Sequence, residues 1–272
     1  MCLLTFEWQP DAAAPLTIAA NRDEFYARPT QALHGWAATA DGQIFAGQDL
    51  QGGGTWMGVH RPSGRLAALT NYRDPRAMRE DAPTRGGIVT AFLNGRQGAA
   101  QFAAELAEYA NTFNAFNLLL FDGRDLVAFE SRHRRYFTPE PGVWAVSNAD
   151  FNTPWPKLLR LRSAFADVLQ AQSPEHRPNA ADISPALEHA LWPLLADSGI
   201  AADAALPSTG IRLELERALS AAFICTPGYG TRASTLVRHA GQRVQIIERS
   251  FDARGAAEPL GTLRLALDGL QS

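Results

Sequence analysis

Two apolar segments at the start of the chain constrain its fold more than any other feature. Residues 2–8 (CLLTFEW) and residues 15–23 (PLTIAANRD) are separated by the turn-forming sequence QPDAAA. This pattern predicts two antiparallel strands joined by a hairpin. Antiparallel pairing about this turn joins positions whose numbers sum to about 24, which places Cys2 opposite Arg22. The thiol therefore lies beside the polar tetrapeptide NRDE at residues 21–24.

The register of this hairpin decides which side chains share a face. A slip of one residue would bring Asn21 or Asp23 opposite Cys2 in place of Arg22, and the thiol would still lie beside the NRDE segment. In the predicted register, one face of the pair carries Cys2, Leu4, Phe6, Trp8, Leu16, Ile18, Ala20 and Arg22.

The remaining pattern predicts an α+β protein. Strands are predicted at residues 42–47, 55–60, 65–73, 135–137, 143–148 and 261–267, with hairpins over 114–133 and 231–251. Helices are predicted at 85–95, 99–110, 154–172 and 183–197, the last broken or kinked near Pro193. Residues 211–223 have mixed periodicity, so the sequence does not decide whether they form a helix or a strand. Strands lie at both ends and in the middle of the chain, which is an α+β order, and no boundary divides residues 1–272, so we expect one domain.

Composition excludes several classes of protein. Of the 272 residues, 46% are hydrophobic and 19% charged, and the formal net charge is -3 with no basic block. This argues against nucleic acid as a partner. No apolar run approaches the roughly 20 residues that span a bilayer, so no transmembrane segment is expected. The start of the chain also lacks the pattern of a signal peptide.

The cysteines and histidines predict neither a disulfide framework nor a metal site. Cys2 and Cys225 are the only cysteines, and neither lies in a CxxC motif. We therefore expect a reduced, cytoplasmic protein. The six histidines form neither HxH nor HExxH. A single axial haem ligand has no spacing signature, so haem ligation by one of them stays open.

Cys2 has two interpretations. It is either a small apolar residue at the start of a strand, or the new N-terminus after removal of Met1. In the second case one residue carries both a thiol and an α-amino group. That amine has a pKa near 7.7–8.0, low enough to accept the proton of the neighbouring thiol. This is the N-terminal form of base-activated nucleophilic catalysis.

Other polar residues at strand ends are candidates for the same site. Asn71 ends the apolar run LAALTN, and Asn148 ends VWAVSN. An asparagine there can direct its amide NH₂ at a developing oxyanion, although a single one is more often a turn or cap residue. Pairing of Arg22 with Asp23 or Glu24 also has a purely structural interpretation, as a charged strand end.

Several familiar motifs are absent or out of context. GGGTWMG lacks the GK[ST] of a phosphate-binding loop, and GYGTRA precedes a predicted strand where a dinucleotide site needs a helix. No GxSxG marks a serine hydrolase.

Six blocks along the chain resemble one family. MCLLTF, AANRDEFYARPT, GGTWMGV, ALTNYRDP, VSNADFNTPWPKL and PGYGTRASTLV occur in this order in the NRDE-motif family, also called the transport-and-Golgi-organisation family. The similarity runs from Cys2 to the last predicted strand.

The family in turn resembles the N-terminal nucleophile hydrolases, which implies a four-layer αββα sandwich. Their cysteine branch includes penicillin V acylases, bile salt hydrolases and acid ceramidase. The resemblance implies that Cys2 is the nucleophile in cleavage of a non-peptide amide bond. It further implies that Asp23 orients the amine and that Asn71 and Asn148 stabilise the oxyanion. Arg232 matches the late arginine of that branch.

One position departs from the hydrolase pattern. Ala20 stands where those enzymes carry an arginine before N-x-D, and Arg22, opposite Cys2 in the predicted hairpin, is the candidate replacement. Asn21, Arg22, Glu24 and Arg232 are accordingly predicted to support the site or to bind substrate.

The same resemblance implies a rival function. Eukaryotic members are linked to Golgi organisation and secretion, to lipid or acyl-CoA metabolism and to haem handling. In this second interpretation the cavity binds or transfers an acyl-CoA, a lipid or a haem-like ligand. The hydrolase interpretation needs a small-molecule amide or acyl substrate, no metal and no resident cofactor. The sequence leaves the oligomeric state open.

Overall fold

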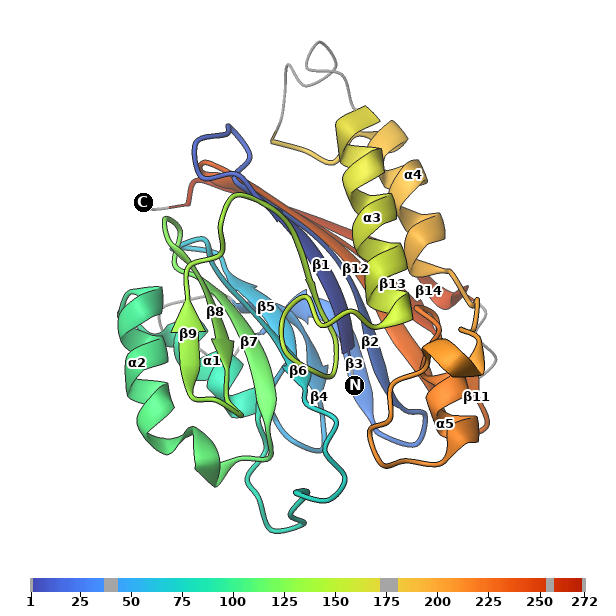
Figure 1. Ribbon diagram of the computed structural model, residues 1–272. Coiled ribbons are helices and arrows are strands. Elements are labelled where there is room, and N and C mark those ends of the chain that lie inside the picture. The colour runs from blue at the N-terminus through green and yellow to red at the C-terminus, as the bar shows by residue number, and fades with distance from the viewer. Residues whose placement is uncertain (1, 37–43, 172–180, 253–256, 271–272) are drawn as a thin grey trace.

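The computed structural model describes residues 2–36, 44–171, 181–252 and 257–270, which form two antiparallel sheets (Figure 1). The first has the strand order β10–β1–β2–β12–β13–β14, with β11 paired to β12. Its strands are β1 (Cys2–Trp8), β2 (Leu16–Phe25), β10 (Gly142–Val146), β11 (Cys225–Thr226), β12 (Tyr229–Ala240), β13 (Arg243–Phe251) and β14 (Ala257–Asp268).

The second sheet is a meander whose strands follow one another in chain order. It consists of β3 (Thr30–Gly35), β4 (Ile44–Asp49), β5 (Met57–His60), β6 (Arg65–Asn71), β7 (Phe116–Phe121), β8 (Leu126–Glu130) and β9 (Arg135–Phe137). Neighbouring antiparallel strands can be joined directly in chain order. The connection from β6 to β7, residues 72–115, is longer and includes two helices.

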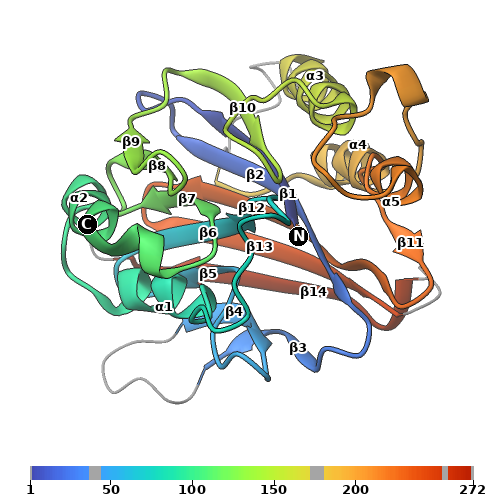
Figure 2. The ribbon, with the colours of Figure 1, turned by 60° about the horizontal axis from the view of Figure 1, so that its bottom comes forward.

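Helices cover the outer face of each sheet. The described residues form α1 (Gly86–Asn94), α2 (Ala99–Tyr109), α3 (Pro156–Ala171), α4 (Pro185–Leu195) and α5 (Leu213–Ala218), with 3₁₀ turns at Ala110–Thr112 and Asp203–Ala205. Figure 2 shows α1 and α2 on one side of the molecule and α3, α4 and α5 on the other. None of these helices is both long and apolar enough to cross a membrane.

Three apolar clusters hold these layers together. One lies between the sheets and includes Phe6, Ile18 and Leu119. A second joins α1 and α2 to the meander sheet, and a third joins α3 and α4 to the first sheet. Burial of apolar side chains on both faces of each sheet is therefore the main source of stability.

The predicted register of the first hairpin is confirmed. Cys2 pairs with Arg22 and Trp8 with Leu16. Alternation then sends the even-numbered residues from Leu4 to Trp8 into the core between the sheets. The odd-numbered Leu3 faces α3 and α4 instead. Both faces of β1 are buried, so a one-residue slip would exchange two complete sets of core contacts.

The predicted helices and strands agree with the structure in most places, and three differences have physical causes. β3 was not predicted, because its polar alternation is interrupted by an irregularity between Gln31 and His34. α4 is not broken at Pro193 and continues two residues past it, because a proline near the end of a helix removes only the one bond that its own N–H would make. In residues 211–223, whose secondary structure the sequence did not decide, only Leu213–Ala218 form a helix.

The core between the sheets yields a stability prediction. Leu119 is 1% exposed there, whereas Leu159 on α3 is 40% exposed. Leu119→Ala should lower the free energy of unfolding by about 2–5 kcal/mol, since it leaves a cavity between the sheets. The same change at Leu159 should lower it by less than about 1 kcal/mol. Urea unfolding of both variants checks this, and equal losses would contradict the assigned core.

Candidate active site

A cavity of about 890 Å³ opens where β1 begins and β2 and β6 end. Cys2, Asp23 and Asn71 line it together with Arg22, Glu24 and Arg232. Residues from β3, β4, β12, β13 and the segment 72–86 form the rest of the wall. Six of the eight predicted site residues therefore share one cavity, although they come from distant parts of the chain.

Cys2 is nearly enclosed at the start of β1. Its side chain is buried, and its backbone carbonyl oxygen lies 3.1 Å from the hydroxyl of Ser147. Burial raises the pKa of the thiol to about 11, while the positive charge of Arg22 acts in the opposite direction. In this arrangement the thiol is protonated at neutral pH. Met1, whose removal the nucleophile hypothesis requires, lies outside the described residues.

Asp23 is buried beside the cavity and is held by the neighbouring strand β12. Its Oδ1 accepts a hydrogen bond of 2.8 Å from the Thr231 hydroxyl. Burial raises the pKa of Asp23, and the nearby charge of Lys157 is the strongest opposing influence. Asp23 is therefore a carboxylate whose ionisation depends on its partners.

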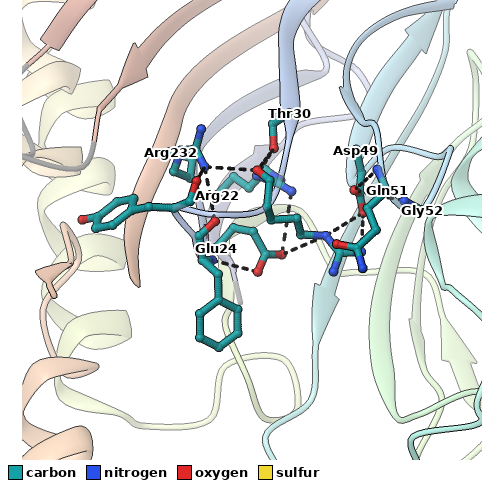
Figure 3. Close-up of polar contacts among 10 residues, drawn as sticks. Arg22, Glu24, Thr30, Asp49, Gln51, Gly52 and Arg232 are labelled. Carbon is teal, nitrogen blue, oxygen red and sulfur yellow. Dashed lines mark hydrogen bonds and ion pairs between the residues drawn. The ribbon is translucent and has the colours of Figure 1, made fainter. Parts of the chain in front are cut away.

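Arg22 and Glu24 belong to a polar network along the cavity wall (Figure 3). Arg22 donates to Thr30 Oγ1 at 3.3 Å, and its guanidinium lies 3.7 Å from the Glu24 carboxylate. Glu24 also lies 3.9 Å from Arg28, which in turn pairs with Asp49 at 2.7 Å. These bonds join β2 to β3 and β4, the two strands at one edge of the meander sheet.

Arg232 reaches this wall because of a bulge. The pairing of β12 with β2 shifts between Thr231 and Ala233, leaving Arg232 as the extra residue. Its Nη1 lies within hydrogen-bond distance of the carbonyl oxygens of Phe25, Tyr26 and Arg28. Arg232 thus fixes the turn that follows the NRDE segment. Figure 3 shows the Arg232 side chain with these contacts as dashed lines.

The two predicted oxyanion residues occupy different positions. Asn71 lines the cavity at the end of β6, and its side-chain amide bonds to no other described residue. Asn148 is fully buried behind it and donates to the Asn71 carbonyl oxygen at 2.8 Å. The Oδ1 of Asn148 lies 3.1 Å from the Ser147 hydroxyl. Asn148, which follows β10, therefore joins the end of that strand to the end of β6, and only Asn71 lines the cavity.

Asn21 points away from the cavity into the protein. Its Nδ2 donates to the carbonyl oxygens of Leu195 and Ala222, both at 2.8 Å. Its Oδ1 accepts from the Ser234 hydroxyl at 2.5 Å. The first residue of the NRDE tetrapeptide thus braces β2 against β12 and the end of α4.

Two buried cations at the site were missed by the sequence analysis. Arg73 lines the cavity, pairs with Glu216 at 2.8 Å and stacks over Trp155 at 4.9 Å. Lys157, in the first turn of α3, is buried, and its charge influences Asp23 more strongly than any other. One signal could have singled it out, because Lys157 is the only lysine in the chain.

No group of three or more potential ligands is placed to hold a metal ion among the described residues. What the cavity offers is a thiol, a buried carboxylate, an unused asparagine amide and several arginines. These groups suit attack on a carbonyl carbon with stabilisation of an oxyanion.

Comparisons with known proteins identify relatives over nearly the full chain. The family model for Transport and Golgi organisation 2 matches residues 1–253. The Transport and Golgi organization protein 2 homolog of Bos taurus is 31% identical over 268 residues, covering 92% of this chain and 93% of the relative. The Homo sapiens homolog is 29% identical over 267 residues, with the same coverage. The Drosophila melanogaster protein is 32% identical over 112 residues, 38% of each chain.

The bonding of Asn21 yields a prediction. Asn21→Ala should lower the free energy of unfolding by at least about 3 kcal/mol, because two carbonyl groups and one hydroxyl lose a buried partner. Asn94→Ala, at the exposed end of α1, is the control and should change it by less than about 0.5 kcal/mol. Urea unfolding measures both. A stable Asn21→Ala protein would show that Asn21 does not brace the strand.

Proposed function

The chain belongs to the Transport and Golgi organisation 2 family, and we propose that it cleaves a non-peptide amide bond with Cys2 as the nucleophile. The observation that carries this proposal is the meeting of Cys2, Asp23 and Asn71 in one cavity. A nucleophile, a carboxylate and an amide donor are the minimum set for acyl transfer at an N-terminal cysteine.

The arrangement of layers supports the same proposal. Two face-to-face sheets share one core, and helices pack on both outer faces. This is the order of layers expected of an αββα sandwich of the N-terminal nucleophile type, and the core that both sheets share supports one domain. We therefore include that fold type in the proposal.

The reaction begins once Met1 has been removed, since a nitrogen in a peptide bond cannot accept a proton. The free α-amine of Cys2 takes the thiol proton, and Sγ attacks the carbonyl carbon of the amide. The C–N bond breaks as that amine gives its proton to the leaving nitrogen, which leaves a thioester on Cys2. Water then attacks the thioester, releases the carboxylic acid and restores the thiol.

The polar wall supplies the remaining roles. The side-chain NH₂ of Asn71 donates to the oxyanion, while Asn148 holds the Asn71 backbone in place. Asp23 balances the positive charge of the protonated amine. Arg22 lowers the pKa of the Cys2 thiol, and Arg232 keeps the turn after β2 in position.

A second candidate function is ligand binding, and the mouth of the cavity favours it. Phe25 and Met78 are 61% and 73% exposed there. Exposed apolar side chains together with polar lining residues suit an acyl chain attached to a polar head, as in an acyl-CoA or a lipid, or the edge of a haem-like ring. Such a protein would need neither an exposed N-terminal amine nor a reactive thiol.

The state of the N-terminus separates these functions. A fusion cleaved so that the chain starts at Cys2 should hydrolyse N-acyl amines, whereas a chain with one extra glycine should lose at least about 10³-fold in kcat/KM. Cys2→Ala should be equally inactive, and Cys225→Ala, which changes the exposed second cysteine, should be fully active. Activity of the glycine-extended chain would contradict the proposal. Inactivity of every form, with tight binding of acyl-CoA or haem, would favour the second function.

The contrast between the two asparagines gives a further test. Asn71→Ala should lower kcat by about 10²–10³-fold with little change in the free energy of unfolding, because its amide serves only the transition state. Asn148→Ala should lower stability as well, since its buried bonds hold the end of β6. Steady-state kinetics and urea unfolding of both variants decide this. An unchanged kcat in Asn71→Ala would remove it from the oxyanion site.

A further inference from the structure

Lys157 is the least expected residue near the cavity. The chain contains 25 lysine and arginine residues, and Lys157 is the only lysine among them. It is also only 2% exposed, in the first turn of α3. An ammonium group in such a position has lost its hydration and needs compensation from the protein.

That compensation does not come from hydrogen bonds. Among the described residues, none lies within hydrogen-bond distance of the Lys157 Nζ atom. The side chain therefore holds no loop or helix end in place, in contrast to Asn21 or Glu216, whose polar atoms have short, direct bonds. A role in stability alone gives no reason for a buried charge without a bonded partner.

The fold places this charge behind the catalytic end of β2. α3 packs on the face of the first sheet that carries Leu3 and Ala19, and alternation along β2 puts Asp23 on that face. The ionisable groups around Lys157 are Asp23 on β2, Cys2 on β1, Glu216 on α5 and Arg73 after β6. The first three favour the ammonium form, and Arg73 opposes it.

We propose that Lys157 is a positioning residue, whose buried ammonium group keeps Asp23 ionised and stabilises the thiolate of Cys2 through space. It contacts no substrate, because it does not line the cavity. The inference deepens the proposed function and rests on it for the role of Cys2 as nucleophile. Burial lowers the pKa of Lys157 to about 8, so the charge that assists Cys2 is lost at mildly alkaline pH.

Alkylation of Cys2 by iodoacetamide tests the effect on the thiol without any need for amide hydrolysis. The rate is followed from pH 6 to 7.5, where Lys157 carries its charge, by mass spectrometry of the N-terminal peptide, with the exposed Cys225 as reference in the same molecule. Lys157→Met should lower the rate of Cys2 alkylation at pH 7 by about 10–100-fold, because a nearby positive charge that favours the thiolate is removed. The Cys225 profile should stay in place.

Two further variants separate this effect from general loss of charge. Arg160→Met removes a positive charge from the exposed face of the same helix and should leave the Cys2 profile unchanged. Lys157→Arg keeps the charge and should restore most of the Cys2 alkylation rate. An unchanged Cys2 profile in folded Lys157→Met protein would overturn the proposal, even if the wild type hydrolyses amides. If Lys157→Met slows the alkylation of Cys2 in a protein that hydrolyses no amide, the result supports the role of Lys157 and counts against the hydrolase function alone.

A measurement on the unaltered chain removes any dependence on the folding of variants. Labelling with [ε-¹³C]lysine gives a single NMR resonance, because the chain has one lysine. Its titration should have a midpoint of about 8. A midpoint well below pH 7 would mean an uncharged amine at neutral pH and would overturn the proposal.

Discussion

The placement of β2 between β1 and β12 is the constraint on which the rest of the site depends. Because β2 is paired on both sides, its last residues have Cys2 as one neighbour and Thr231 as the other. Backbone hydrogen bonding thus brings together residues more than 200 positions apart. A one-residue slip of β2 would exchange the faces of Arg22 and Asp23 and so break the arrangement around Cys2.

The site contains charged groups that are destabilised by burial. The burial of apolar side chains in the three cores supplies the stability that offsets this cost. Asp23, Arg73 and Lys157 are all withdrawn from water. Arg73 is compensated by a direct ion pair and by stacking on Trp155, whereas Lys157 depends on longer-range attraction. A buried pair of this kind contributes little to stability, and its value lies in setting the ionisation of its neighbours.

Local patterns in the sequence predicted the first hairpin, its register and a strand over 65–73 that contains β6, because alternation and turn residues act over short distances. The meeting of Cys2, Asp23 and Asn71 followed from pairing and from family resemblance together. The bulge at Arg232 and the bond from Asn148 to the Asn71 backbone could not be predicted, since both depend on contacts between distant segments. Lys157 was overlooked because a helical pattern does not reveal what lies opposite a helix.

The central claim is that the thiol of Cys2, freed from Met1, forms a covalent bond with an acyl group inside this cavity. Rapid acid quenching of the protein during reaction with an N-acyl amine, followed by mass spectrometry of the N-terminal peptide, tests it most directly. The account predicts a peptide that starts at Cys2 and carries the acyl group as a thioester, with Cys225 unmodified. An N-terminal peptide that retains Met1 and carries no acyl group, in protein that nevertheless turns over the substrate, would contradict it.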